Sequence, residues 1–172
     1  QLFDLTGAVA VVTGASGTLG RSFAVTLAEA GARVALVGRN MAALEEARQA
    51  VLDAGGTAAC VSSDVTRTGA IGDMYRAVER EIGVPTVLVN NAGTVNQKRT
   101  AELTAADWDS VMDVNLRAAF LVAQGFGRRR IAAGGGGAIV NIASITGISA
   151  PATITPYSVS KAALIQLTRN LA

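Results

Sequence analysis

Tyr157 and Lys161 are the residues whose types and spacing best suit proton transfer to an oxygen. They are four residues apart in a segment that we expect to be helical, so their side chains project from the same face. A tyrosine alone is too weak an acid to be an efficient base at neutral pH, but a neighbouring ammonium favours the phenolate. Ser144, just after an expected strand, can bond the same oxygen. The chain has no histidine, which excludes Ser-His-Asp catalysis and His-ligated metal sites.

A glycine-rich segment, residues 13–20, directly follows the first expected strand and opens the first expected helix. In that context Gly14 permits a tight turn, Gly17 lets the backbone approach a ligand, and Gly20 lets the helix pack on the sheet. The amides of the helix N-terminus then face the pyrophosphate of a dinucleotide. The alternative is an ordinary strand-to-helix turn that contains three glycines. The residues predicted to bind the pyrophosphate are Gly14, Ser16, Gly17, Thr18, Leu19 and Gly20.

The end of the second expected strand discriminates between NAD and NADP. NAD enzymes usually place Asp or Glu there to bond the ribose 2′-hydroxyl, whereas this chain has Gly38, Arg39 and Asn40. With no acid to repel a 2′-phosphate, Arg39 can bind one through its planar guanidinium, although it can also be a solvated loop arginine. We therefore expect NADP(H), with NAD(H) as the alternative. Asp64, just beyond the third strand, is either an acceptor for the adenine edge or a helix cap.

Five short apolar runs alternate with longer helical patterns. Each run is nearly continuous, as expected of strands that are buried on both faces. The expected strands are residues 9–12, 34–37, 58–61, 87–89 and 138–142, and the expected helices are residues 18–30, 41–54, 67–82, 104–132 and 155 onward. Because parallel crossovers need helices and are right-handed, this order predicts an α/β fold. We expect a Rossmann-type doubly wound parallel sheet with helices on both faces, in a single domain over residues 1–172.

Composition narrows the class of protein further. Half of the residues are apolar and only 16% are charged, which favours a surface partly covered by another subunit, although a large core alone gives the same figure. One cysteine, no signal-peptide pattern and no apolar segment of membrane-spanning length indicate a cytoplasmic protein without a membrane partner. The basic cluster at residues 128–130 has no interleaved aromatic residues, so we expect no nucleic-acid partner.

The segments 90–93 (Asn-Asn-Ala-Gly) and 157–161 (Tyr-Ser-Val-Ser-Lys) closely resemble those of the short-chain dehydrogenase/reductase family, classical type. The glycine turn and Ser144 stand at family-like spacing, and the resemblance covers the chain from Leu2 to its last residue. It implies an NAD(P)(H)-dependent oxidoreductase that transfers a hydride between a nicotinamide and a secondary alcohol or ketone.

The resemblance also implies roles for individual residues. Tyr157 would be the general acid/base and Ser144 would stabilise the substrate oxygen. Lys161 would modulate Tyr157 and bind the ribose, and Asn115 would hold a water in a proton relay. Asn90 would support the central strands. The other implied cofactor-binding residues are Asn91, Ala92 and Gly93 along the cofactor, and Asp64 and Val65 at the adenine.

Two features depart from the classical pattern. Thr18 stands where the second glycine is usual and Gly17 comes one residue earlier, which is the spacing of the family's extended branch. An extended-type epimerase or dehydratase is therefore an alternative, as is a non-catalytic dinucleotide-binding regulator. Family members also continue past the Tyr-Lys helix with two more strands and a substrate-binding loop. Because this chain stops at Ala172, we expect that it is truncated before its final strands.

Two loops bear on the substrate and one pair of helices bears on assembly. Residues 94–99 and 154–156 resemble loops of gluconate 5-dehydrogenase and 2-deoxygluconate 3-dehydrogenase relatives, which implies a sugar acid or keto acid. Lys98 and Arg99 can attract a carboxylate, or can simply belong to a solvated loop. In the family, the helices that correspond to 104–132 and 155–172 pack against a neighbouring copy, which implies a homodimer or homotetramer.

Overall fold

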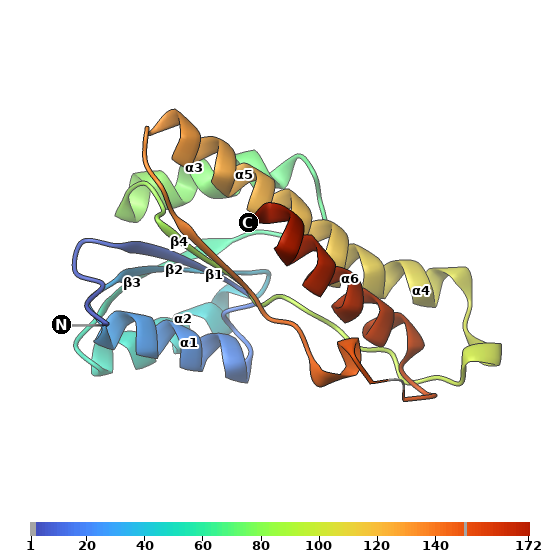
Figure 1. Cartoon of the computed structure of the whole chain (residues 1–172). Helices are drawn as coiled ribbons and strands as arrows, with labels where there is room; N and C mark the ends of the chain where they lie inside the picture. The colour runs from blue at the N-terminus through green and yellow to red at the C-terminus, as the bar shows by residue number, and fades with distance from the viewer. Residues whose placement is uncertain (1–2, 150) are drawn as a thin grey trace.

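A parallel sheet forms the centre of the computed structural model, which describes residues 3–149 and 151–172 (Figure 1). Its five strands lie in the order β3-β2-β1-β4-β5, and every neighbouring pair is parallel. The strands are β1 (Val9–Thr13), β2 (Arg33–Gly38), β3 (Thr57–Ser62), β4 (Val87–Asn90) and β5 (Ala138–Asn141). The predicted Rossmann-type sheet is confirmed. Residues 1, 2 and 150 of the predicted domain lie outside the described residues.

Helices cover both faces of this sheet. Figure 1 shows α1 (Thr18–Glu29) and α2 (Met41–Asp53) on one face, and α3 (Ala70–Ile82) and α5 (Ala118–Ala132) on the other. The last helix, α6 (Thr155–Leu171), packs against α4 (Ala105–Met112) and the π-helical turn η2 (Asp113–Arg117). Two short 3-10 turns complete the element list, η1 (Thr100–Glu102) and η3 (Ile145–Gly147). No helix in the described part of the chain is long and apolar enough to cross a membrane.

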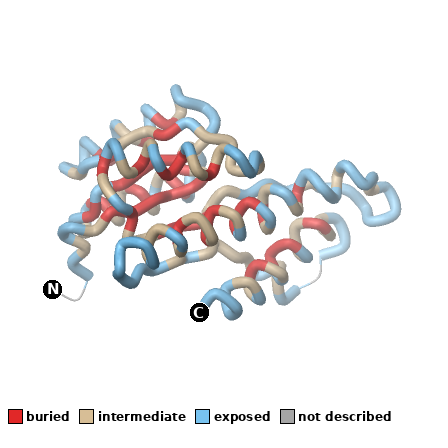
Figure 2. The backbone as a smooth tube through the Cα atoms, turned by 90° about the horizontal axis from the view of Figure 1, so that it is seen from above, coloured by how far each residue is buried: buried red, intermediate tan, exposed pale blue. Residues whose placement is uncertain are grey.

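The central strands are buried because their alternate side chains fill two separate cores (Figure 2). Val9 and Val11 of β1 belong to the core shared with α3 and α5. Ala10 and Val12 belong to the core shared with α1 and α2. Apolar side chains are therefore needed at the first four positions of β1, residues 9–12, which explains the continuous apolar run. This two-sided packing fixes the carboxyl ends of the strands, where the site residues are attached.

Three expectations about the elements need correction. The fifth strand is not buried on both faces, since Val140 is 48% exposed at the edge of the sheet. The expected helix over residues 104–132 consists of α4, η2 and α5, because in η2 the Ala118 amide bonds to the carbonyl of Asp113, five residues earlier. The third helix begins at Ala70 rather than at residue 67, because the Asp64 carboxylate accepts the Thr66 amide and forms a turn there.

Candidate active site

A cleft of about 970 Å³ opens at the carboxyl ends of the strands, between the turn after β1 and the start of α6. It lies where β1 and β4 are neighbours, the point at which strand order reverses and where open α/β sheets bind their ligands. Every residue predicted to bind the cofactor lines this cleft, from Gly14 through Arg39, Asp64 and Gly93 to Lys161. Residues far apart in the sequence are thus brought together at one surface.

The glycine turn has the backbone geometry that a bound pyrophosphate requires. Gly14 has φ +64°, a conformation that favours glycine. Gly17 is the N-cap of α1 and forms no side-chain cap, so N–H groups of the first turn are left for an anion. A Cβ on Gly17 would lie 3.5 Å from the Gly14 carbonyl oxygen, an ordinary contact, whereas a Cβ on Gly20 would lie 2.3 Å from it. Thr18, at the position of the usual second glycine, begins α1 and lines the cleft.

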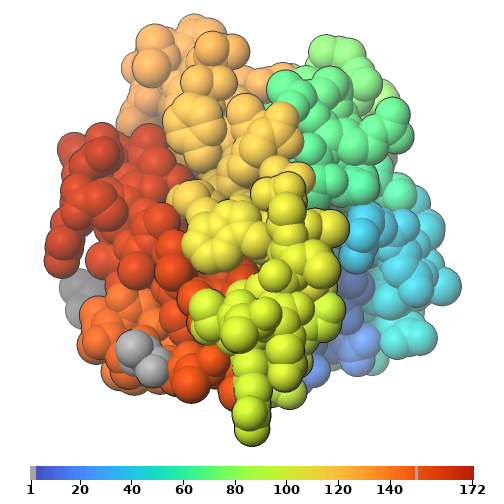
Figure 3. All heavy atoms as spheres, turned by 90° about the vertical axis from the view of Figure 1, so that its right-hand side faces the viewer, coloured from blue at the N-terminus to red at the C-terminus, as the bar shows by residue number. Residues whose placement is uncertain are grey.

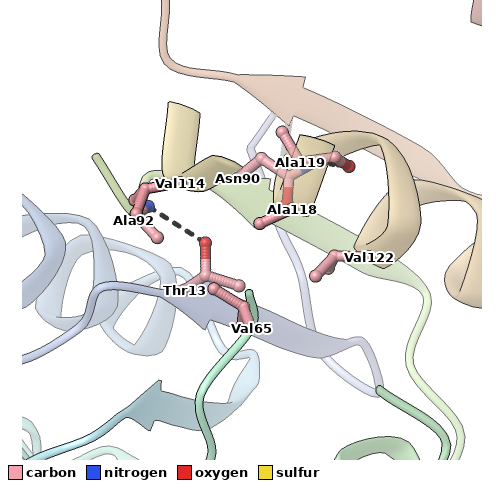
Figure 4. Close-up of a pocket in the computed structure, with 8 residues that line it drawn as sticks. All are labelled: Thr13, Val65, Asn90, Ala92, Val114, Ala118, Ala119 and Val122. Atoms are coloured by element: carbon pink, nitrogen blue, oxygen red, sulfur yellow. Dashed lines mark hydrogen bonds between the residues drawn. The ribbon is translucent and has the colours of Figure 1, made fainter. Parts of the chain in front are cut away.

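Thr13 and Asn91 fix this turn to the end of β4. The Thr13 hydroxyl oxygen accepts the amides of Asn91 and Ala92, each at 3.1 Å, and Figure 4 shows the second of these bonds. The Asn91 Nδ2 donates to the carbonyls of Thr13 (3.0 Å) and Gly14 (3.1 Å). Asn91 therefore braces the turn as well as lining the cleft. Thr13 was missed by the sequence interpretation, and its position directly before Gly14 is the signal that could have identified it.

Asn90 joins the strands behind the cleft. Its Nδ2 donates to the Ala119 carbonyl (3.1 Å) and to Oδ1 of Asn141 on β5 (2.9 Å), and Figure 4 shows the first of these bonds. Beside it, a crevice between β1, β4 and α5 has no volume accessible to water. The floor of the cleft is consequently tightly packed and leaves no second chamber there.

Tyr157 and Lys161 share one wall of the cleft, at the start of α6. The Lys161 Nζ lies 5.6 Å from the centre of the Tyr157 ring and donates to the Ile142 carbonyl at 2.6 Å. Lys161 is only 4% exposed, and this burial lowers the pKa of its ammonium. An anion next to that ammonium would oppose this lowering and favour the charged form, so the pair is suited to stabilise a phenolate.

Ser144 and Asn115 stand beside the cleft and are not among the residues that line it. The Ser144 Oγ accepts the Thr146 amide at 3.2 Å and lies 3.0 Å from the Thr146 hydroxyl, as the N-cap of η3. Asn115 is buried in η2, where its amide bonds to both backbone groups of Thr94 and to Ser160. The structure thus brings Tyr157 and Lys161 into the cleft and holds the other two predicted catalytic residues in hydrogen bonds within the protein.

The end of the cleft beside β2 and β3 is lined by Arg39, Asp64 and Val65, the residues expected to meet the adenosine part of the cofactor. Asp64 Oδ1 accepts the Thr66 amide (3.0 Å) and the Thr66 hydroxyl (2.7 Å), and these two bonds lower the pKa of that carboxyl. Asp64 therefore closes a turn and also lines the cleft, while the N-cap of α3 is Gly69. Arg39 is exposed at the end of β2, and its charge also lowers the pKa of Asp64.

Comparison with known proteins assigns the chain to a family. The sequence profile described as short chain dehydrogenase matches residues 8–172. The chain belongs to the short-chain dehydrogenase family. It is 40% identical to a gluconate 5-dehydrogenase of Gluconobacter oxydans, over 100% of this chain and 67% of that relative. It is 34% identical to a 2-dehydro-3-deoxy-D-gluconate 5-dehydrogenase of Dickeya dadantii, over 99% of this chain and 66% of that relative. The chain spans about two thirds of the length of these curated relatives.

Solved structures of this dehydrogenase family have the same fold. A crystal structure assigned as a short-chain alcohol dehydrogenase of Sinorhizobium meliloti has a TM-score of 0.96 and 41% identity, and covers 100% of this chain and 68% of that one. A structure assigned as a 2-deoxy-D-gluconate 3-dehydrogenase of Agrobacterium tumefaciens, with bound NADP, has a TM-score of 0.90 and 36% identity, and covers 98% and 66%. An NAD+-bound xylitol dehydrogenase has a TM-score of 0.93 and 35% identity, and covers 98% and 65%.

The loop after β4 of this short-chain dehydrogenase is attached to the start of α4. Thr104 and Asp107 form a capping box, and Asp107 also accepts from Asn96 (2.7 Å) and from Lys98 (2.8 and 2.9 Å). These bonds, the one from Lys98 first, lower the pKa of Asp107. Lys98 is exposed, as expected of a solvated loop, and it is also paired with the Asp107 carboxylate, with which an anionic substrate would have to compete.

Asp107→Asn is expected to lower the Tm by about 2–4 °C at neutral pH, because the charged bonds to Lys98 and the capping box weaken. A folded-state pKa below the unfolded value of about 3.9 means that the stabilisation is complete above that pH and is lost as the pH falls below it. The Tm difference between the two proteins should therefore narrow below about pH 4. Thermal unfolding from pH 7 to pH 2 measures it, with Asp109→Asn on the same helix as the control. A Tm difference that stays constant from pH 7 to pH 2 would contradict the stabilising role assigned to the Asp107 carboxylate.

Proposed function

We propose that this chain carries the cofactor and catalytic sites of an NAD(P)(H)-dependent dehydrogenase that acts on a secondary alcohol or ketone. The observation that carries the proposal is that the cleft joins the uncapped glycine turn of α1 to Tyr157 and Lys161. A dinucleotide fits this cleft: the N–H groups in the first turn of α1, after Gly17, suit a pyrophosphate, and the side chain that Gly17 lacks leaves room for it. When bound, the nicotinamide supplies or accepts the hydride.

The residues of the chain supply the proton and its control. In ketone reduction the Tyr157 hydroxyl donates a proton to the substrate oxygen, and in alcohol oxidation the phenolate accepts it. Lys161 stabilises the phenolate through its ammonium, which the Ile142 carbonyl holds in place. We assign to Ser144 the bond to the substrate oxygen; its Oγ accepts from the Thr146 amide and hydroxyl, so its own O–H can donate to that oxygen. We assign to Asn115 the role of holding a water molecule that relays protons near Lys161.

We further propose that NADP(H) is preferred over NAD(H). Arg39 supports this preference, because it lines the cleft at the end of β2, where an NAD enzyme usually has a carboxylate. Arg39→Ala is expected to raise the KM for NADPH by about 10–100-fold and to leave the KM for NADH almost unchanged, since only NADPH loses a charge-assisted bond. The control is Arg67→Ala, an exposed arginine that does not line the cleft. Equal effects on both cofactors would contradict the proposal.

The substrate class that we propose is a sugar acid or a related polyol, which is oxidised to its keto form. In the reverse direction the keto form is the substrate. The matched relatives and structures named as gluconate, 2-dehydro-3-deoxy-D-gluconate and xylitol dehydrogenases support it. We also propose a cytoplasmic homodimer or homotetramer. Exposed apolar side chains on α5 and α6 support the assembly, among them Phe120 (40%), Ile131 (82%) and Val159 (40%).

One observation favours a second candidate, an extended-type epimerase or dehydratase. That observation is the Gly14, Gly17, Gly20 spacing, which is the pattern of the extended branch. A screen of the full-length protein for NADPH consumption with ketones and keto-sugar acids distinguishes the two. A dehydrogenase oxidises NADPH in proportion to the ketone reduced, whereas an epimerase regenerates its bound cofactor in each cycle. Rapid turnover with NADH and none with NADPH would refute the cofactor preference.

A further inference from the structure

Ser160 is a buried hydroxyl between the two residues of the Tyr-Lys pair. Its exposed fraction is 0%. Its Oγ donates to the backbone carbonyl of Tyr157 at 2.7 Å and accepts from the Nδ2 of Asn115 at 3.0 Å. Both hydrogen-bonding directions of the hydroxyl are thus used, one toward its own helix and one toward a neighbouring element.

Asn115 continues this connection to the loop after β4. Its Oδ1 accepts the Thr94 amide at 2.8 Å, and its Nδ2 donates to the Thr94 carbonyl at 2.9 Å. That loop passes next to the ammonium, since a Cβ on Gly93 would lie 3.7 Å from the Lys161 Nζ. A continuous series of bonds therefore joins the loop after β4, the π-helical turn η2 and the first turn of α6. Figure 3 shows the chain after β4 (yellow-green), α4 (yellow) and the start of α6 (orange-red) side by side on one face of the molecule.

We propose that Ser160 is a positioning residue, which sets the place of Tyr157 and Lys161 relative to the loop at Gly93. This inference rests on the proposed function of Tyr157 as the proton donor. Without the Ser160 hydroxyl, one buried N–H of Asn115 loses its partner. The start of α6 then also loses its connection through Asn115 to the loop at Thr94. The two side chains of the pair then keep their chemistry but lose their orientation, to which proton transfer is sensitive.

The chain contains a matched control on the same helix. Thr168 donates to the carbonyl of Leu164 at 2.8 Å and accepts from the Nδ2 of Asn141 at 2.9 Å. This is the same pair of bonds that Ser160 makes, but it lies about two turns further along α6, and Thr168 does not line the cleft. Loss of the Thr168 hydroxyl should therefore reproduce a loss of helix anchoring without disturbing the pair.

The experiment compares Ser160→Ala with Thr168→Val in the full-length protein. For Ser160→Ala we expect kcat to fall about tenfold or more, with the KM for NADPH within about twofold of the parent. For Thr168→Val we expect kcat within about twofold of the parent. The two variants should differ in kcat even if their Tm values are equal. If Ser160→Ala does not fold, Ser160→Cys, whose thiol is a weaker donor and acceptor, is measured in its place.

A second measurement is independent of turnover. The tyrosinate absorbance that Tyr157→Phe removes from the parent spectrum belongs to Tyr157, which identifies it among the tyrosines of the full-length protein. In the complex with NADP+, that absorbance should develop at a higher pH in Ser160→Ala than in the parent, and at the parent's pH in Thr168→Val. Equal behaviour of the two variants, in kcat and in absorbance, would overturn the positioning role. If the parent protein turns over no ketone, the proposed function fails, and the absorbance comparison still decides the inference.

Discussion

Tyr157→Phe is expected to lower kcat for ketone reduction by about 10³-fold and to leave the Kd for NADPH within about twofold. The phenol is the only part of this wall of the cleft that can give a proton to a substrate oxygen at low cost, because Lys161 is buried and bound to the Ile142 carbonyl. Phenylalanine keeps the ring and its contact with Lys161, so the site should keep its shape. Stopped-flow measurement of NADPH oxidation gives kcat, and fluorescence titration gives the Kd.

The matched control for this variant is Tyr75→Phe. The Tyr75 hydroxyl donates to the Val122 carbonyl at 2.8 Å in the core between α3 and α5, and Tyr75 does not line the cleft. Its loss should reduce the free energy of unfolding by about 1 kcal/mol and leave kcat unchanged. If Tyr157→Phe keeps more than about a tenth of the parent activity, another group supplies the proton, and the assignment of Tyr157 is wrong.

The sequence predicts the central part of the fold because each signal there is local. The apolar run of β1 is continuous because both of its faces are covered, and the capping box at Thr104 lies within four residues. The exposure of the edge strand β5 was not predicted, because an apolar run alone does not show whether helices cover both faces of a strand. The π-helical turn was not predicted for a related reason. Asn115 in that turn is hydrogen-bonded to Thr94, which lies 21 residues earlier in the chain, and no local pattern reports such a bond.

The candidate site was predictable to the extent that motifs mark it. The residues assigned to the cofactor all line the cleft, because they follow the carboxyl ends of parallel strands and those ends meet at one edge. Thr13 and Ser160 were not predicted, since their importance lies in bonds to Asn91 and Asn115 that no local pattern reports. The pairing of Lys98 with Asp107 was not predicted for the same reason, because that carboxylate belongs to a helix nine residues later.

Gly20→Ala is expected to destabilise the protein and Gly17→Ala is expected to weaken cofactor binding alone. A Cβ on Gly20 would lie 2.3 Å from the Gly14 carbonyl oxygen and 2.8 Å from the Cα of Ala15, so backbone must move. Overpacking of this kind costs about 1–3 kcal/mol, and contact with backbone places it at the upper end. Alanine recovers about 1 kcal/mol of helix propensity, which leaves a net loss of about 2 kcal/mol in the free energy of unfolding.

Gly17→Ala separates the two roles of the turn. Gly17 has φ −82°, which alanine adopts freely, and its Cβ would make only an ordinary contact at 3.5 Å. The added methyl group nevertheless projects where the N–H groups of α1 meet the pyrophosphate, so the Kd for NADPH should rise about tenfold or more. Urea unfolding and NADPH titration of both variants measure these effects. An unchanged Kd for NADPH in a stable Gly17→Ala protein would show that the phosphates bind elsewhere in the cleft. A Gly17→Ala protein that is less stable than the parent would show that the turn needs glycine at this position for folding.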